Sequence, residues 1–504
     1  PVLLPDTEGA HAPFFSPEGR SVGFWASPRL KMVAIDGGSS TELTDAEGFG
    51  GASWGKSGII ASINGTLRRV SQTSRESTEV LDLRKQGVRA LWPDLLPGET
   101  HVLFTALGPR GPDASNIEVF SLSESKRTPL VRAGFGRYLR DDYLLYANQG
   151  TLFAVPFDRQ QLAVQGTGVP VLADRVAQNP IFGNAKLDIA QNGTLIYRRS
   201  PSLVASWLDS GGAIKPLLTK PGAYTFPRLS PNGRSLAINV IDSGVIRSEI
   251  RDLRRPDAPP VPLPPGSMSA VWHSDEFLVL GSLSGGMSWM RADDPSKVAS
   301  LRQSSTVQIP LSFTANGTHL AFLEESDPRG LDIWTLPVRH SAGKLAAGEA
   351  EPYLQTPLVE SAPSFSPDGR WLLYGQGPGG NWNVYVRPFP RDDSKPAIQV
   401  SQEGGRIGRW LKNGREIVYR TDDHRLMVVD YQVKNGAISV GKAKEWTTVR
   451  LGDTGVIPNF DVYGERILGL VPASREEAER IRTQVTVMPR FADDVRRILA
   501  RGGK

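Results

Sequence analysis

The sequence has 504 residues, a formal net charge of +5 and no cysteine, and its 58 basic side chains are scattered among 53 acidic ones. The missing cysteines exclude disulfides, thiolate nucleophiles and cysteine-ligated metal sites, and the mixed charge argues against a nucleic-acid partner. No apolar run approaches the roughly 18 residues of a membrane-spanning helix, and the 52 glycines and 39 prolines are typical of a soluble, turn-rich protein.

A hairpin pattern repeats from the N-terminus onwards. Each copy has an apolar strand, a polar turn that usually ends in Gly, and a second apolar strand, as in HAPFFSPEGRSVGFWA from His11 and SFSPDGRWLLY from Ser364. Successive turns lie 39 to 52 residues apart, which is the length of one four-stranded propeller blade. The turn landmarks are Gly19, Gly58, Gly98, Asp142, Gly193, Gly233, Asp275, Gly317, Gly369, Gly414 and Gly464.

A third strand, such as LDIWTLPV or WNVYVRPF, follows each hairpin, and a fourth usually follows that. Val, Ile, Tyr, Phe and Trp alternate with polar residues there, so the sequence predicts an all-β fold of tandem β-propellers. Helical patterns are rare. Phe491, Val495, Ile498 and Leu499 share one face of a predicted short C-terminal helix, and ASREEAERIR from Ala473 is a weaker helical candidate.

Two segments predict two rings. PVLLPDTEGAHAPFFSPEGRSVGF from Pro1 aligns with KPLLTKPGAYTFPRLSPNGRSLAI from Lys215, and each puts a fourth-strand segment before a first hairpin, as in propeller closure. We expect five blades in the first ring, closed by Val2–Leu4, and six in the second, closed by Pro216–Thr219; alternatives are six plus six blades or a single ring of eleven. The expected domains are an N-terminal propeller over 1–210, a C-terminal propeller over 211–490 and a helical tail over 491–504.

The repeated acidic or amide residue in the turns is expected to be structural. In the turn that ends at Gly369, Pro367 presets the backbone, Asp368 can bond the local backbone, and Gly369 accepts the positive φ that the hairpin requires. Asp368 is therefore predicted to form a turn and not to act as a catalytic acid.

The sequence contains no recognisable catalytic motif, so it predicts that this chain is not an enzyme. MVAID carries Asp36 where a kinase would place its ATP-contacting Lys, and no Gly-rich loop or DFG is present. GRSVG from Gly19 matches a nucleophile elbow in letters, but Ser21 opens a strand there and not a helix. The six histidines are dispersed without the i, i+4 spacing of a helix-borne metal site, and no calcium loop occurs, so no catalytic residue, metal or cofactor is expected.

The repeats SPEGRSVGF, SPNGRSLAI, SPDGRWLLY and LDIWTL resemble the WD40-like, TolB-like propeller repeat. More narrowly, TEGAHAPFFSPEGRSVGF, NVYVRPFP, RWLKNGREIVYR and FDVYGERILGLVP resemble the C-terminal propeller region of acidobacterial-type bacterial serine/threonine protein kinases. The resemblance covers nearly the whole chain. It implies an extracytoplasmic location, periplasmic or at the cell surface, with a membrane anchor and a kinase domain upstream; the start PVLLPDTEGA shows no export signal of its own.

Any ligand site is expected at the mouth of a channel, where the loops leading into the first strand of each blade gather. Arginines there are suited to a carboxylate or phosphate. Trp54, Trp92 and Trp410 are expected to pack between blades. The candidate ligand-binding residues are His11 and Arg137 in the first ring and Tyr224, Arg228, Glu360, Arg406 and Arg409 in the second.

We therefore expect a non-catalytic sensor or interaction domain that binds a protein, a peptide or a small ligand. One alternative is a propeller enzyme, a metal-dependent lyase or a lactonase-like hydrolase, whose channel would hold a metal. The other is a periplasmic scaffold like TolB that works through protein contacts.

Overall fold

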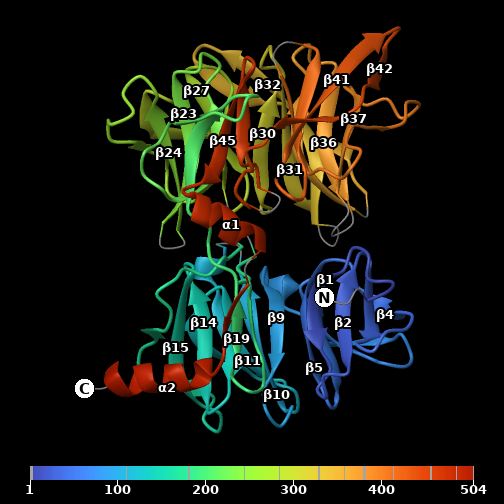
Figure 1. Ribbon diagram of the computed structural model, residues 1–504, viewed down its shortest axis with the longest axis vertical. Helices are drawn as coiled ribbons and strands as arrows, with labels where there is room; N and C mark the ends of the chain where they lie inside the picture. Colours follow the sequence, from blue (N-terminus) through green and yellow to red (C-terminus); the bar gives the residue numbers. More distant parts are fainter. Residues whose placement is uncertain are drawn as a thin grey trace. The chain divides into compact units, whose positions relative to one another are not determined.

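The computed structural model describes residues 4–502 except 109–110, 180–181, 243–244, 283, 327–329, 357, 378–381, 412–413, 455–456 and 484. It confirms an all-β fold built from antiparallel sheets, with a short C-terminal helix, α2 (Phe491–Gly502) (Figure 1). The weaker helical candidate also forms a helix, α1 (Arg475–Thr483). Within the described ranges, neither helix has the length and apolar character needed to cross a membrane.

The sheets form two compact units, one with residues 1–200 and 484–504 and the other with residues 201–242 and 246–483. The first unit holds five sheets, named blades 1 to 5, and the second holds six, named blades 6 to 11, which confirms tandem propellers of five plus six blades. The expected boundary near residue 210 differs from these units, because residues 203–208 form a strand of blade 11.

The strands of the first unit are, in blade 1, β1 (His11–Phe15), β2 (Ser21–Ala26), β3 (Arg29–Ala34) and β4 (Thr41–Asp45); in blade 2, β5 (Phe49–Gly55), β6 (Gly58–Ile63), β7 (Thr66–Val70) and β8 (Ser77–Leu81); in blade 3, β9 (Arg89–Leu95), β10 (His101–Leu107), β11 (Asn116–Ser121) and β12 (Arg127–Arg132); in blade 4, β13 (Phe135–Leu139), β14 (Tyr143–Asn148), β15 (Thr151–Asp158), β16 (Ala163–Val164) and β17 (Val169–Pro170); and in blade 5, β18 (Leu187–Ile189), β19 (Leu195–Tyr197) and β46 (Thr486–Met488).

The strands of the second unit are, in blade 6, β22 (Ala223–Leu229), β23 (Ser235–Asp242), β24 (Val245–Asp252) and β25 (Val261–Pro262); in blade 7, β26 (Ser267–Trp272), β27 (Phe277–Ser282), β28 (Met287–Arg291) and β29 (Asp294–Arg302); in blade 8, β30 (Gln308–Phe313), β31 (His319–Ser326), β32 (Gly330–Ser341), β33 (Lys344–Ala347) and β34 (Glu351–Leu354); in blade 9, β35 (Val359–Phe365), β36 (Trp371–Gly377), β37 (Asn383–Pro388) and β38 (Ile398–Gln399); in blade 10, β39 (Ile407–Trp410), β40 (Glu416–Arg420), β41 (Leu426–Lys434), β42 (Ala437–Val440) and β43 (Lys444–Thr447); and in blade 11, β44 (Phe460–Tyr463), β45 (Arg466–Pro472), β20 (Leu203–Leu208) and β21 (Ile214–Pro216).

The hairpin turns have the geometry that the sequence predicts. Gly369 has φ +69°, and its N–H donates to the carbonyl oxygen of Ser366 at 2.9 Å. The carboxylate of Asp368 accepts hydrogen bonds from the Ser366 hydroxyl at 2.6 Å and from the Arg370 backbone N–H at 3.1 Å. Asp368 is thus confirmed as a turn former.

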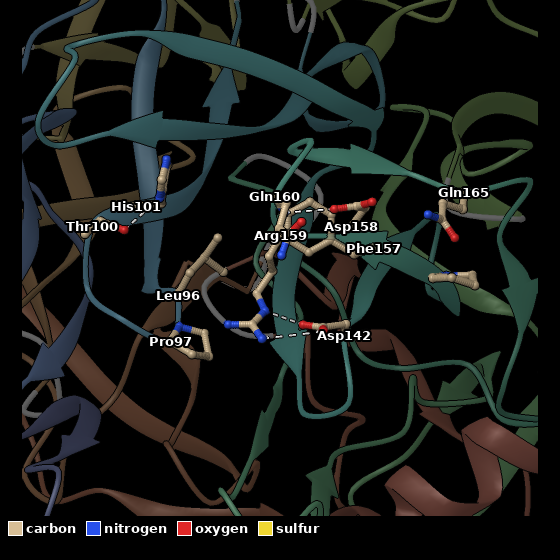
Figure 2. Close-up of a pocket in the computed structure, with 11 residues that line it drawn as sticks. Leu96, Pro97, Thr100, His101, Asp142, Phe157, Asp158, Arg159, Gln160 and Gln165 are labelled. Carbon is tan, nitrogen blue, oxygen red and sulfur yellow. Dashed lines mark hydrogen bonds and ion pairs between the residues drawn. The ribbon is translucent and has the colours of Figure 1, made fainter.

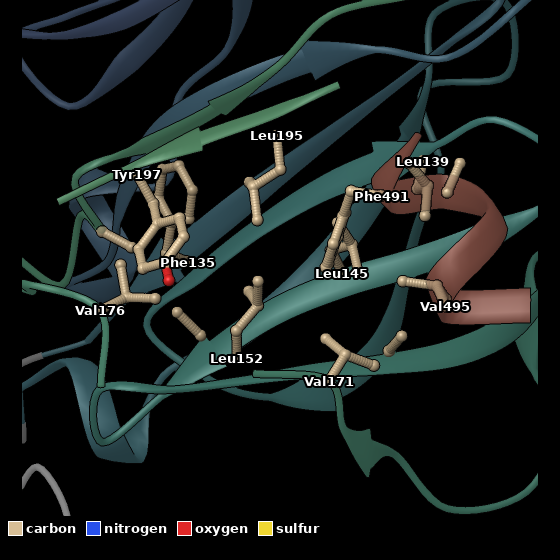
Figure 3. Close-up of a cluster of buried hydrophobic side chains, with 14 residues drawn as sticks. Phe135, Leu139, Leu145, Leu152, Val171, Val176, Leu195, Tyr197, Phe491 and Val495 are labelled. Atoms are coloured by element: carbon tan, nitrogen blue, oxygen red, sulfur yellow. The ribbon is translucent and has the colours of Figure 1, made fainter. Parts of the chain in front are cut away.

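The tail helix α2 belongs to the first unit. Phe491 and Val495 are fully buried in a cluster with Leu145 of blade 4 and Leu195 of blade 5 (Figure 3). Ile498 and Leu499, from the same helix face, are partly buried against this cluster, which confirms the predicted apolar face.

The expected closing strand of the first ring, Val2–Leu4, stays a prediction, because most of it lies outside the described residues. Leu4 lies in no strand, and Val2 and Leu3 fall outside the described residues. Among the described residues, blade 5 takes its third strand from the other end of the chain, because β46 pairs with β19 through Leu195 with Met488 and Tyr197 with Thr486.

The second ring does close with an N-terminal segment, but with two strands and not one. β20 pairs with β45, and β21, which ends at Pro216, pairs with β20 as the outermost strand of blade 11. Residues 217–219, part of the expected closing segment, lie just beyond this strand. A four-residue apolar match shows which end closes the ring but not how many strands it supplies.

Candidate binding site in the second unit

The first strands of the six blades of the second unit form a closed cycle. β22 contacts β26, and contacts continue through β30, β35, β39 and β44 back to β22. Side chains on these strands therefore meet around one axis, which is where propellers bind ligands.

A recurring hydrogen bond joins neighbouring first strands. A side-chain oxygen near the end of one strand accepts the backbone N–H of the next blade, at 2.8 to 3.0 Å, and we call this contact the interblade latch. The latches are Ser53 with Leu95, Asp94 with Tyr138, Ser312 with Phe365, and Asp461 with Leu229. The last of these joins blade 11 to blade 6 and so closes the second ring.

Two of the predicted arginines meet at the closing latch. Arg228 precedes Leu229 on β22, and Arg409 occupies β39 on the other side of blade 11. Arg409 Nε lies 3.8 Å from Asp461 Oδ1. The two arginines interact electrostatically with Asp461 and with each other, although a whole blade separates their strands.

Both guanidinium groups are buried, with each arginine 5% exposed. Arg228 Nη1 donates to the carbonyl oxygen of Pro227 at 3.0 Å, and Arg409 Nη1 donates to that of Gly408 at 2.8 Å. The Nη2 atom of each arginine is buried and has no hydrogen-bond partner among the described residues.

The charges of this cluster are unbalanced. Burial, and then repulsion from Arg228, lower the pKa of Arg409 to about 9 against the attraction of Asp461. Burial also lowers the pKa of Arg228, which Asp461 opposes. Two guanidinium groups share one carboxylate, so the cluster keeps a positive charge and two unused N–H donor groups. An oxyanion, a carboxylate or a phosphate, has the charge and the acceptor atoms that this arrangement lacks.

The other predicted residues of the second ring lie apart from this cluster. The Tyr224 hydroxyl donates to the carbonyl oxygen of Lys220 at 2.8 Å, and burial raises its pKa. Arg406 forms an ion pair with Asp422, and its guanidinium lies 5.4 Å from the ring centroid of Trp382. Both side chains are thus engaged by groups close to them in sequence or space.

Glu360 is fully buried on β35 and accepts hydrogen bonds from Thr356 and Gln376. Burial, aided by the negative charge of Asp332, raises the pKa of its carboxyl to about 8 against these two hydrogen bonds. A carboxyl group in that state is mainly neutral at pH 7, so Glu360 is not a counter-charge for the arginines.

In the first ring, His11 and Arg137 are not brought together by any contact that the described residues show. The His11 ring lies 6.3 Å from that of Trp25. Arg137 Nη1 donates to the carbonyl oxygen of Trp92 at 3.2 Å, and its guanidinium lies 4.4 Å from the ring centroid of Phe135.

The three tryptophans expected to pack between blades do so. Trp54 packs against a core cluster of blades 1 and 2, and Trp92 against the cluster of blades 4 and 5. Trp410 is buried, and its Nε1 donates to the carbonyl oxygen of Ser364 in the preceding blade at 2.9 Å.

A cavity of about 570 Å³ lies between blades 3 and 4 (Figure 2). Its arginine is already paired: Arg159 forms an ion pair with Asp142, which also accepts the hydroxyl of Tyr138 at 3.0 Å. The carboxylate of Asp158 accepts the backbone N–H groups of Gln160 and Gln161. The His101 ring contacts the hydroxyl of Thr100 at 2.9 Å. None of the candidate ligand-binding residues predicted from the sequence lines this cavity, so the unbalanced charge of the second ring is the stronger indication of a binding site.

Over the described part of the chain, no three His, Asp or Glu side chains gather in a way that could hold a metal ion. His273 and His340 approach each other, with ring centroids 5.8 Å apart, but they pack edge to face beside Phe277.

Sequence reasoning found both arginines and missed Asp461. This residue lies in NFDVYGERILGL, a weak copy of the hairpin repeat, three residues before Gly464, whereas Arg409 lies five residues before Gly414. Aligning the copies on their turn glycines therefore does not bring Asp461 to the position of Arg409, and their proximity is seen only in the structure.

No family model matches the sequence, and no curated protein is significantly similar to it. Among solved structures, a protein described as TolB from Agrobacterium tumefaciens has 13% identity and a TM-score of 0.37, over 54% of this chain and 99% of that one. TolB from Acinetobacter baumannii has 14% identity and a TM-score of 0.35, over 70% and 82%. The β-propeller domain of Cps50 (Swd1) from Myceliophteria thermophila has 14% identity and a TM-score of 0.32, over 61% and 95%. These values are low, so the fold assignment rests on the sheets themselves.

Proposed function

We propose that this chain is a non-catalytic interaction domain whose second ring binds the oxyanion group of a ligand between Arg228 and Arg409. The observation that supports the proposal is the pair of buried Nη2 atoms, which lack partners among the described residues in a cluster that keeps a positive charge. The ligand is a partner protein, a peptide or a small molecule that presents a carboxylate or a phosphate.

The sequence resemblance supports a more specific role. On that basis we place the domain outside the cytoplasm, as the sensor region of a membrane-anchored bacterial serine/threonine kinase. Binding in the ring would then be the event that the receptor detects.

The test is a titration of the full chain with inorganic phosphate, with acetate, and with a short peptide carrying either a free or an amidated C-terminus, at constant chloride. We expect saturable binding of at least one oxyanion. Arg409→Gln and Arg228→Gln should each weaken it by about 10- to 100-fold, because a hydrogen bond to a charged group contributes about 1.5–3 kcal/mol.

Two further variants control this test. Arg228→Lys keeps the charge but loses the fork of N–H donors, so it should retain part of the affinity. Arg425→Gln removes an arginine that is already paired with Asp423, at 2.8 Å, and should bind as the wild type does. Equal binding by wild type and Arg409→Gln, or no saturable binding of any of these oxyanions, would contradict the proposal.

A further inference from the structure

Blade 11 closes the second ring. Its inner strands, β44 and β45, come from the end of the unit, and its outer strands, β20 and β21, come from the beginning. The two halves are joined by the pairing of β20 with β45, from Leu203 with Pro472 to Leu208 with Ile467.

Blade 11 contacts blade 6 through hydrogen bonds and through buried apolar side chains, and we call this contact the seam. The Leu229 N–H donates to Asp461 Oδ2 at 2.8 Å, and the Phe226 N–H donates to the carbonyl oxygen of Pro458 at 3.0 Å. The Tyr463 hydroxyl donates to the carbonyl oxygen of Asn232 at 2.9 Å. The same two blades also share a buried apolar cluster that includes Leu229 and Leu468.

The two arginines stand on opposite sides of blade 11. Arg228 belongs to blade 6, and Arg409 belongs to blade 10. An oxyanion held by both Nη2 atoms therefore connects β22 of blade 6 with β39 of blade 10, the first strands on either side of blade 11. It also neutralises the positive charge that the two arginines leave beside Asp461, and so removes a repulsion between blades 6 and 10.

Blade 11 also carries both chain connections to the first unit. The chain passes from β19 of blade 5 to β20 of blade 11, and it returns from β45 of blade 11 through α1 to β46 of blade 5. Within blade 5, β19 and β46 are neighbouring, hydrogen-bonded strands. Opening or closing of blade 11 would therefore act on both chain connections between the units.

We infer that oxyanion binding between Arg228 and Arg409 is coupled to closure of the second ring, so that the bound ligand stabilises the seam between blades 11 and 6. This inference rests on the proposed function, and it adds that closure of the ring is the event that ligand binding regulates. A ligand that binds the closed ring more tightly than the open ring favours the closed form. At saturation, the equilibrium constant between the two forms changes by the ratio of the two affinities.

The test is hydrogen–deuterium exchange of the full chain with and without saturating inorganic phosphate, with binding measured separately by titration. We expect exchange to slow several-fold in peptides covering 203–208, 223–229 and 457–472, and to change much less in blade 8 and blade 9. At the phosphate concentration that saturates the wild type, Arg409→Gln should show a much smaller change in exchange, because its affinity for the oxyanion is expected to be about 10- to 100-fold lower.

Asp461→Ser keeps both arginines and replaces the carboxylate with a hydroxyl, which makes the latch of Ser53 and of Ser312. It should weaken the seam, because a neutral acceptor forms a weaker hydrogen bond than a charged one. Its seam should exchange faster than that of the wild type without phosphate and should recover when phosphate is added. Ser312→Ala removes a latch between blades 8 and 9 and is the matched control, with an unchanged phosphate response at the seam.

The outcomes separate the two proposals. Saturable phosphate binding without added protection at the seam, in wild type or in Asp461→Ser, overturns the coupling and leaves the proposed function standing. Absence of saturable phosphate binding overturns oxyanion recognition for this probe, and the coupling with it.

Discussion

The buried charges of the second unit lie in two separate groups. Among its described residues, every buried arginine belongs to blade 6 or blade 10, and every buried carboxylate belongs to blade 8 or blade 9. Partly exposed groups outside the two sets supply some of the opposite charge: Asp461 lies beside Arg409, and Arg302 pairs with Glu324. Hydrogen bonds, a shifted pKa or a ligand must stabilise the charge that remains. The residues are Arg228, Arg409 and Arg420 in the first group and Glu324, Asp332 and Glu360 in the second.

The buried carboxyl of Glu360 should make the stability of the folded chain depend on pH. The raised pKa of its carboxyl, about 8 against an ordinary value of 4.5, means that the folded chain holds a proton that the unfolded chain releases. The stability that this proton provides is fully present below pH 4.5 and is lost as the pH rises through 8, a change on the order of a few kcal/mol. Glu360→Gln cannot ionise, so its melting temperature should exceed that of the wild type increasingly from pH 5 to pH 9.

The control for this prediction is Glu465→Gln, at an exposed position in the turn between β44 and β45. Its melting temperature should follow that of the wild type at every pH. A constant difference between Glu360→Gln and the wild type over this range would show that Glu360 ionises normally in the folded protein.

At the scale of elements, what the sequence predicts depends on how local the cause is. The hairpin turns follow from neighbouring residues, and the spacing of the turns predicts eleven blades in two rings. Closure is not local. β46 pairs with β19 although almost 290 residues separate them, and no short apolar pattern distinguishes Thr486–Met488 from the N-terminal segment as the partner of a free strand edge.

The same limit applies to the candidate site. The position of Arg228 and Arg409 at the channel follows from their place in the repeat, whereas Asp461 is identified only when the three first strands are brought side by side. Tyr224 and Arg406 are engaged by Lys220 and Asp422, contacts that depend on loop conformations and not on the repeat.

The packing between blades predicts a contrast between two glycines of blade 9. A Cβ on Gly375 would lie 2.1 Å from the carbonyl oxygen of Arg406 in blade 10, whereas one on Gly369 would have no atom nearer than 3.8 Å. Gly369→Ala should cost about 1 kcal/mol, because its φ of +69° strains an alanine.

Gly375→Ala must push two blades apart, and we expect it to cost about 2–4 kcal/mol. The free energy of unfolding from urea titrations measures both values. An equal loss in the two variants would show that blade 9 and blade 10 are packed more loosely than the structure indicates.

At the scale of the whole molecule, the two units have separate cores. Phe491 is fully buried in the cluster formed by blades 4 and 5 and α2, and Leu468 is fully buried in a cluster of blades 6 and 11. No residue belongs to both clusters. Each unit should therefore unfold as its own cooperative step, and a thermogram of the full chain should contain two transitions.

Truncating one core residue in each unit tests this independence. Phe491→Ala and Leu468→Ala should each cost about 3–5 kcal/mol, because each leaves a cavity in a buried cluster. Phe491→Ala should lower the transition of the first unit and leave the other in place, and Leu468→Ala should do the reverse, with hydrogen–deuterium exchange assigning each transition. Phe491 lies near the C-terminus, so its effect on blades 4 and 5 also tests whether the chain end holds the first unit together. A parallel shift of both transitions in either variant would mean that the units unfold together, and that the two connections between blades 5 and 11 couple them as one folding unit.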